Sequence, residues 1–292
     1  MTGAIAEKRE IKLGMTIKEE NDLWKFLKNL KKNKSLITAS INSNQINDEM
    51  LSNGLYTNHS YTITRIAEII YYPQNIKIIK CRNPWGRKEY NGAWSDNSKE
   101  WKYINDPLQK ILEYKVADDG EFWMSWNEFK RYFNILEFCY FTINAVEPSA
   151  KPNSEWKTIS CHGEWIKGGI SVCGCNHDLG KSKKNRHKLS LQQYASKTTE
   201  NFFVIVSLMQ KFKREHRKDD NASKFETIMF NIWKKNDKGN LRQMIDKSEF
   251  IDSREVTKRF ILPVDDYIIV PRCDANSKGG KYLLRLFIVD KV

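Results

Sequence analysis

Apolar side chains recur with helical spacing near the start of the chain, over residues 17–34. Leu23, Phe26, Leu27 and Leu30 lie at positions i, i+3, i+4 and i+7, which places them on one face of an amphipathic helix. Beyond this helix, short apolar runs alternate with polar turns. Up to residue 145 the pattern predicts strands at 36–41, 60–70, 76–81, 120–125 and 135–143, short helices at 107–116 and 126–132, and loops at 42–57 and 91–106.

The pattern changes after a stretch that contains Pro148 and Pro152, which is typical of a linker. The second half consists of short apolar runs separated by polar turns, and this favours an antiparallel sandwich. The expected strands are 202–208, 225–233, 257–262, 267–270 and 282–289. The predicted fold class is therefore α+β, with a β-rich domain at 1–145, a linker at 146–155 and an all-β domain at 156–292.

Length and composition agree with two globular domains. The chain has 292 residues, of which 40% are hydrophobic. No apolar run reaches the roughly 18 residues needed to span a bilayer, and the N-terminus lacks a signal-peptide core. The six cysteines are few for this length, so we expect reduced thiols rather than a disulfide framework. These features predict a cytoplasmic protein.

One histidine and one asparagine stand at the ends of two neighbouring predicted strands. His59 opens the first strand, and the second strand runs into Asn83 and Trp85. An antiparallel pair would place His59 beside Asn83, whose amide oxygen accepts a ring N–H and so turns the other ring nitrogen towards a thiol. Trp85 would cover that hydrogen bond. A single pair of this kind is more often structural than catalytic. The surrounding residues are therefore needed to distinguish the two roles.

A long ordered series of motifs surrounds this pair. It comprises Gly54-Leu55, His59-Ser60-Tyr61, Arg82-Asn83-Pro84-Trp85-Gly86, Asn91-Gly92-Ala93-Trp94-Ser95-Asp96 and Asp119-Gly120-Glu121-Phe122-Trp123-Met124-Ser125. The series resembles the second half of the protease core of calpains, which are calcium-dependent, papain-like cysteine proteases. The resemblance implies that His59 is the catalytic base, that Asn83 orients it, and that the substrates are proteins.

The second half of the chain also resembles calpains, in their C2-like sandwich domain. The matching segments are Gly163-Glu164-Trp165, Phe202-Phe203-Val204, Ser207-Leu208-Met209-Gln210-Lys211, Leu262-Pro263 and Tyr267-Ile268-Ile269-Val270-Pro271. The resemblance thus extends over nearly the whole chain.

No cysteine precedes His59, and Cys81 lies only two residues before Asn83, which is the wrong place for a nucleophile. The resemblance places the nucleophilic cysteine and the oxyanion-hole glutamine in a first core half that this sequence does not contain. We therefore expect this polypeptide to be inactive alone and to need that missing half as a partner. It is either an incomplete product of a full calpain gene or a truncated paralogue. The alternative function is a non-enzymatic module that responds to calcium or anionic phospholipid.

The resemblance also implies a calcium site in this half of the core. Its ligands would be four carboxylates and one backbone carbonyl, and calcium takes six to eight oxygen ligands of this kind. They fall on Glu89, Asp96, Asp119, Glu121 and the carbonyl of Ala117. The alternative is that these are ordinary surface acids. Arg87 and Lys88 beside Glu89 would weaken calcium affinity, and the chain has no EF-hand loop.

Cysteine and histidine residues gather between positions 161 and 177, and they raise the question of zinc. Cys161, Cys173, Cys175 and His177 are zinc-type ligands, but their spacing matches no familiar finger. A structural turn is the alternative that we favour.

Positive charge is concentrated in the second half. Residues 146–292 carry 28 Lys and Arg against 18 Asp and Glu, a net +10 of the chain's +13. This charge suits an anionic phospholipid surface, or it is a solvated basic face. Residues 190–201 hold only Glu200 as an acid, which argues against a calcium site in the sandwich. Association with membranes, in response to calcium, remains an expectation, and nucleic-acid binding is not expected. The lipid-binding candidates are Lys211, Lys213, Arg214, Arg217 and Lys218.

Overall fold

The computed structural model describes residues 4–43, 49–71, 73–142, 145, 157–166, 185–211, 225–236, 241–274 and 277–291. The chain divides into two compact units, Met1–Pro148 and Ser149–Val292. No helix among the described residues is both long enough and apolar enough to cross a membrane.

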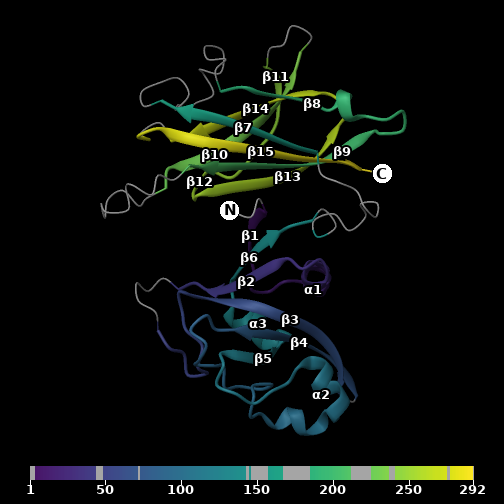
Figure 1. The fold of residues 1–292 in the computed structure, drawn as a ribbon, viewed down its shortest axis with the longest axis vertical. Helices are drawn as coiled ribbons and strands as arrows, with labels where there is room; N and C mark the ends of the chain where they lie inside the picture. The colour runs from purple at the N-terminus through teal and green to yellow at the C-terminus, as the bar shows by residue number, and fades with distance from the viewer. Residues whose placement is uncertain are drawn as a thin grey trace. The chain divides into compact units, whose positions relative to one another are not determined.

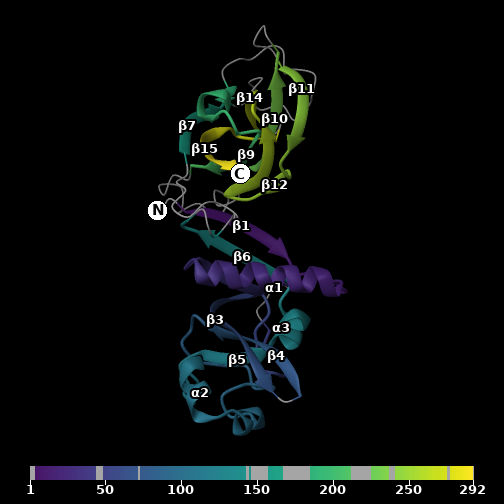
Figure 2. The same cartoon turned by 90° about the vertical axis from the view of Figure 1, so that its right-hand side faces the viewer.

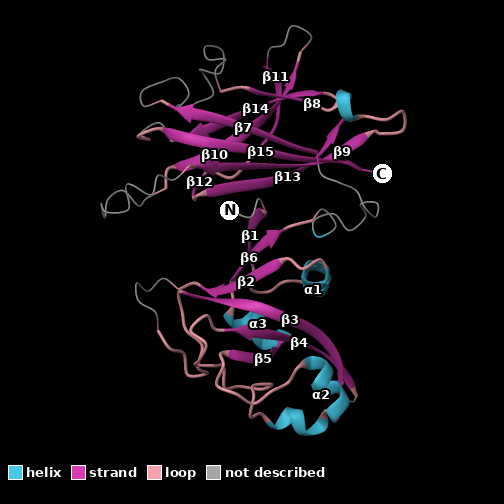
Figure 3. Ribbon diagram, viewed as in Figure 1, coloured by secondary structure: helices cyan, strands magenta, loops and turns pink. Residues whose placement is uncertain are grey.

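The first unit is built on a six-stranded antiparallel sheet (Figures 1 and 3). Its longest strands form a hairpin, in which β3 pairs along nearly its whole length with β4. The order across the sheet is β1 (Ile5–Glu10), β6 (Ile135–Tyr140), β2 (Leu36–Ile41), β3 (His59–Tyr71), β4 (Gln74–Arg82) and β5 (Glu121–Ser125).

Two helices, α1 (Ile17–Lys32) and α3 (Trp126–Tyr132), meet on one face of this sheet. Thr16 begins α1 with a capping box: its hydroxyl accepts the Glu19 N–H, and the Glu19 carboxylate accepts the Thr16 N–H at 2.8 Å. The rings of Trp24 and Trp126 lie 5.2 Å apart, edge to face, and join the two helices. Figure 2 shows α1 side-on across the unit.

The opposite face of the β3–β4–β5 region carries a separate, tryptophan-rich core. A 3₁₀ turn at Lys99–Tyr103 and the helix α2 (Asp106–Leu112) cover it. Because side chains alternate across a strand, Ile78 and Lys80 of β4 face this layer and Cys81 faces the other. The cluster consists of Ile69, Ile78, Trp94, Trp101, Ile104, Leu112 and Trp123.

The second unit is a sandwich of two antiparallel sheets. One has the order β13 (Glu255–Pro263), β9 (Asn201–Gln210), β15 (Gly280–Lys291) and β7 (Lys157–Trp165). The other has the order β11 (Leu241–Lys247), β10 (Thr227–Lys235), β14 (Asp266–Cys273) and β8 (His187–Ser190), and the short β12 (Ile251–Asp252) pairs with β10. Alternate residues of β9 and β10, such as Val204 and Phe230, are fully buried in one core between the sheets.

The predicted fold class is confirmed: a β-rich unit with helices is followed by an antiparallel sandwich. The helix predicted over residues 107–116 ends at Leu112, because Glu113 adopts the left-handed conformation (φ 53°). The predicted linker at 146–155 lies outside the described residues. The sequence analysis missed five strands: β1, β7, β8, β11 and β12.

Two of the missed strands, β1 and β11, share a physical cause. Only Ile5 is buried in β1, and no residue of β11 is, so neither strand shows an apolar alternation. Both are edge strands of their sheets, and charged side chains are common there because they discourage pairing with other chains. Strands of this kind are specified by their neighbours rather than by their own pattern.

Gly54 offers a test of the packing under the candidate site. It has φ +87°, and a Cβ there would lie 2.2 Å from the Glu89 carbonyl oxygen. Gly54→Ala should therefore lower the free energy of unfolding by about 3 kcal/mol or more, through backbone strain and overlap together. Chemical denaturation followed by tryptophan fluorescence would measure this loss.

Gly14→Ala is the matched control. Gly14 has φ +76° with nothing near its missing Cβ, so this variant should cost only the left-handed penalty of about 1 kcal/mol. Equal losses for the two variants would show that the contact with Glu89 is unimportant.

Candidate active site

The β3–β4 hairpin brings His59 and Asn83 together. Thr62 pairs with Arg82 at the open end of the hairpin, so the residues just beyond this pair lie side by side. Asn58 precedes β3 in the left-handed conformation (φ 51°), and its N–H donates to the Ile41 carbonyl at 2.6 Å. This turn fixes the direction in which the chain enters β3, and with it the position of His59 at the start of the strand.

A hydrogen bond joins the two side chains, and its polarity is determined by the neighbours of Asn83. The Trp85 N–H donates to Asn83 Oδ1 at 3.1 Å, and Asn83 Nδ2 donates to the Lys88 carbonyl at 2.9 Å. The amide therefore has only one orientation that satisfies both groups. Since Oδ1 lies 3.0 Å from His59 Nε2, that ring nitrogen carries the proton and donates it.

Asn83 itself is rigidly placed. Its side chain is fully buried, its N–H donates to the Gly120 carbonyl at 2.8 Å, and its carbonyl accepts the Gly86 N–H at 3.0 Å. Gly120 has φ +83°, and a Cβ there would lie 2.9 Å from the Asn83 oxygen, so only glycine permits this approach. All of the polar groups of Asn83 are thus used within the unit.

Aromatic rings enclose the histidine on two sides. The Trp85 ring lies 4.3 Å from the His59 ring, centroid to centroid, and the Tyr61 ring lies 5.0 Å away, edge to face. Burial raises the pKa of Tyr61 to about 12, so it remains a neutral phenol, and its oxygen accepts the Tyr56 N–H at 2.8 Å. Trp85 keeps 45% of its surface exposed. The Trp85 ring thus lies against the His59 ring, and the cover that it was expected to give the histidine–amide pair stays a prediction.

The other ring nitrogen, His59 Nδ1, has no hydrogen-bond partner among the residues that the structure describes. Beside Trp85 lies an open pocket of about 530 Å³, and Arg87 and Lys88 are the other described residues that line it. The Lys88 ammonium also donates to the Tyr56 hydroxyl at 2.9 Å. A protonated Nε2 and an unpartnered Nδ1 give the arrangement that a histidine needs to accept a proton from a nucleophile.

No described cysteine is a hydrogen-bond partner of His59. Cys81 is fully buried on the face of the sheet that α1 and α3 cover, and burial raises the pKa of its thiol. Burial raises the pKa of Cys273 in the sandwich to about 11. Neither residue has the exposed, electropositive setting that favours a thiolate.

Both halves of the chain match domains of known proteins. Residues 1–140 match the calpain family cysteine protease domain, and residues 161–287 match domain III of the calpain large subunit. The chain belongs to the calpain family.

Individual calpains match nearly the whole chain. Calpain-9 of Mus musculus is 33% identical over 98% of this chain, and the Calpain-1 catalytic subunit of Rattus norvegicus is 32% identical over 98%. Calpain clp-4 of Caenorhabditis elegans is 31% identical over 87%. The match covers 42%, 42% and 39% of these three relatives, so the chain spans less than half of their length.

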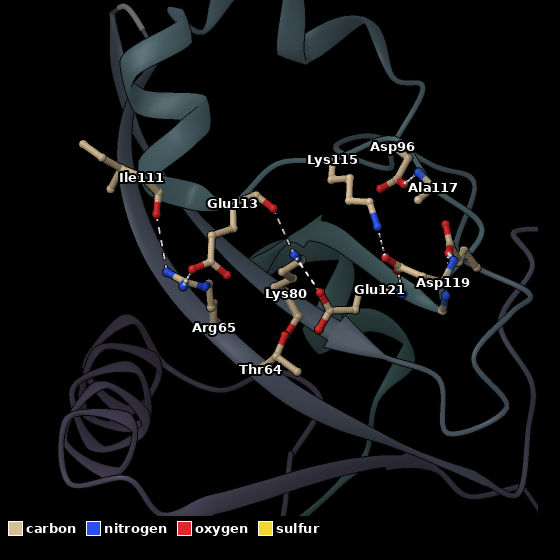
Figure 4. Close-up of polar contacts among 12 residues, drawn as sticks. Thr64, Arg65, Lys80, Asp96, Ile111, Glu113, Lys115, Ala117, Asp119 and Glu121 are labelled. Carbon is tan, nitrogen blue, oxygen red and sulfur yellow. Dashed lines mark hydrogen bonds and ion pairs between the residues drawn. The ribbon is translucent and has the colours of Figure 1, made fainter.

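The residues that the calpain resemblance assigned to calcium form a network of hydrogen bonds and electrostatic interactions next to β4 and β5 (Figure 4). Glu89 Oε1 accepts the N–H groups of Asp119 and Gly120 at 3.0 and 2.7 Å, and Asp96 Oδ2 accepts the Ala117 N–H at 3.0 Å. Asp119 Oδ1 in turn accepts the Glu121 N–H at 3.0 Å. The fold therefore gathers all five predicted ligand residues around the loop that leads into β5.

Negative charge is crowded in this network. Burial, together with the charges of Asp96 and Asp119, raises the pKa of Glu89. Burial and the charges of Asp119 and Glu121 raise the pKa of Asp96. For Asp119, burial acts in the same direction, but the Glu121 N–H and the Lys115 ammonium outweigh it and lower the pKa. An additional cation would therefore relieve repulsion here.

The donor set suits calcium, but the side chains are not arranged around an ion. Four carboxylates and a carbonyl are hard oxygen ligands of the kind that calcium takes. Yet no three Asp, Glu, His or Cys side chains in the described part of the chain converge as a metal site would require. The carboxylates point instead at backbone N–H groups and at two lysines, Lys80 and Lys115.

The remaining predicted sites are only partly visible. Of the zinc candidates, Cys161 lies on β7, whereas Cys173, Cys175 and His177 fall outside the described residues. Of the lipid-binding candidates, Lys211 contacts His162, and Lys213, Arg214, Arg217 and Lys218 also fall outside them. The zinc and lipid hypotheses therefore stay predictions. The sequence analysis gave no role to Tyr56 or Lys80, whose positions depend on strand pairing and loop closure.

Asn83→Ala tests the hydrogen-bond network directly. The change leaves the His59 and Trp85 N–H groups and the Lys88 carbonyl without their partner, which should lower the free energy of unfolding by about 2–3 kcal/mol. Denaturant titration would measure the loss. Asn91→Ala is the control, because the Asn91 side chain is exposed and makes no hydrogen bond among the described residues. A loss for Asn83→Ala no larger than for this control would contradict the network.

Proposed function

We propose that this chain is the His/Asn-bearing half of a calpain-type cysteine endopeptidase core, followed by the calpain sandwich domain. The observation that carries the proposal is the 3.0 Å contact between His59 Nε2 and Asn83 Oδ1, whose polarity leaves Nδ1 free to act as a base. Family membership supports the same reaction class, since both halves of the chain match calpain domains.

The chemistry proposed for His59 has two steps. A cysteine thiol passes its proton to Nδ1 as its sulfur attacks the substrate carbonyl carbon. The same proton then moves to the amide nitrogen as the carbon–nitrogen bond breaks and the amine leaves. Asn83 holds the ring plane and the tautomer throughout, and the Trp85 ring shields the hydrogen bond from water.

The nucleophile in this proposal comes from another segment of polypeptide. Among the described cysteines, Cys81 is buried and its pKa is raised, which is the opposite of an activated thiol. The chain by itself should therefore not cleave peptide bonds, and it should become competent only beside a first core half that supplies the thiolate and the oxyanion hole.

The proposal includes a calcium ion. Its ligands would be the carboxylates of Glu89, Asp96, Asp119 and Glu121 and the carbonyl of Ala117. Its role would be to neutralise the crowded carboxylates and fix the loop before β5 next to Asn83. The raised pKa values of Glu89 and Asp96 support this assignment, because burial and the neighbouring carboxylates disfavour their charged forms, and a bound cation would offset both effects.

Reconstitution tests the proposed catalysis. The chain would be mixed with the first core half of a calpain relative, and hydrolysis of a fluorescent protein substrate would be measured. We expect cleavage only when both halves are present, and His59→Ala should reduce the rate at least about 100-fold, because it removes the general base.

His162→Ala is the matched control for His59→Ala, since His162 lies on an exposed position of β7 in the sandwich. This control should keep the full rate. Cleavage by the wild-type chain alone, or full activity of His59→Ala in the mixture, would overturn the proposal.

Calorimetric titration with CaCl₂ tests the calcium assignment without any activity readout. Asp96→Asn should weaken binding about tenfold or more, because a buried charged ligand becomes neutral. Asp22→Asn, an exposed position on α1, should leave the affinity unchanged. Equal affinities for the wild type and Asp96→Asn would show that the cation binds elsewhere.

A further inference from the structure

A buried lysine reaches the carboxylate network from the sheet. Lys80 lies on β4, and only 8% of its side chain is exposed. Its ammonium lies 2.8 Å from Glu121 Oε2 and donates to the Glu113 carbonyl at 3.1 Å (Figure 4). Glu113 is itself held by Arg65, which pairs with its carboxylate. The ammonium therefore bridges β5 and the end of α2 from a fixed position.

A second lysine reaches the same network from the loop. The Lys115 ammonium lies 3.0 Å from Asp119 Oδ2, and 67% of the Lys115 side chain is exposed. Two of the four carboxylates, those of Glu121 and Asp119, thus have a lysine partner, whereas those of Glu89 and Asp96 accept backbone N–H groups. Each of the four carboxylates thus has a partner within the protein, although the described side chains do not form a coordination shell.

We propose that Lys80 and Lys115 are internal counter-ions of this network, and that they compete with a divalent cation for Glu121 and Asp119. A cation has to break these two ion pairs to reach the carboxylates, so the lysines raise the concentration of cation needed to fill the site. The identification of the cation as calcium rests on the proposed function.

Lys80 is the stronger competitor of the two, for a reason of solvation. When Glu121 turns to a cation, the Lys80 ammonium stays buried and keeps the Glu113 carbonyl as its one hydrogen-bond partner among the described residues. A buried charge without an opposite charge beside it is costly. A dication placed nearby also repels it. Lys115 can instead move into water at little cost, as exposed ion pairs contribute little. The cation concentration needed to fill the site should therefore depend mainly on Lys80.

A purely structural role for Lys80 makes a different prediction. In that case the lysine only neutralises Glu121 within the sheet, and its removal changes stability without improving cation binding. The two roles are separated by the sign of the change in affinity, which a stability measurement alone would not give.

The test is calorimetric titration of the 292-residue chain with CaCl₂, for the wild type, Lys80→Met, Lys80→Arg and Lys115→Met. Methionine keeps most of the buried chain without its charge. We expect Lys80→Met to bind calcium at least about tenfold more tightly, and Lys80→Arg, which keeps the charge, to bind like the wild type. Lys115→Met should gain about two- to threefold at low salt, and the gain should vanish at high salt.

Lys18→Met is the matched control, because it removes one positive charge from an exposed position on α1. Its affinity should equal that of the wild type. Unchanged or weaker binding by a folded Lys80→Met would overturn the inference and leave the calcium site standing. Absence of calcium binding in the wild type and in all variants would overturn both the role of the lysines and the proposed calcium site.

A second measurement covers the case in which Lys80→Met does not fold. Nitrogen-15 NMR of the lysine ammonium groups in the wild type should show the Lys80 resonance shifting as calcium saturates the site, because its ion pair with Glu121 is broken. A Lys80 resonance that does not move at saturation would overturn the inference independently of any variant.

Discussion

The three hydrogen bonds made by the Asn83 side chain are the constraint on which the candidate site depends. One from Trp85 and one to Lys88 leave the amide a single orientation, and the third then determines the proton position on His59. Because the amide is fully buried, these bonds cannot be exchanged for water without a large cost. The histidine is thus prepared for proton transfer by groups that lie entirely within one structural unit.

Strand β4 serves two sites at once, because successive side chains leave opposite faces of the sheet. Its end carries Asn83 next to the histidine, and Lys80 points to the layer that contains the carboxylate network. Gly120 links the two places, since its carbonyl accepts the Asn83 N–H and its own N–H donates to Glu89. A movement of the Glu89 carboxylate would therefore be passed to Asn83 through Gly120, which is hydrogen-bonded to both residues.

The sequence predicted much of this arrangement, and the reason lies in local patterns. The helical spacing of Leu23 and Leu27 and the alternation in β3 each specify an element on their own. The proximity of His59 to Asn83 followed from the expected antiparallel pairing of two neighbouring strands, and the calpain resemblance supplied the carboxylates. By contrast, β1 and β11 carry few buried side chains, so only their neighbours in the sheet define them. Lys80 was missed because its partners, Glu113 and Glu121, come from distant loops and strands.

The central claim concerns the proton on one ring, and NMR can observe that proton directly. A long-range proton–nitrogen correlation spectrum of the neutral His59 ring would report which nitrogen is protonated. The hydrogen-bond pattern predicts the tautomer with the proton on Nε2 and none on Nδ1. A ring protonated on Nδ1, or a mixture of the two tautomers, would contradict the account.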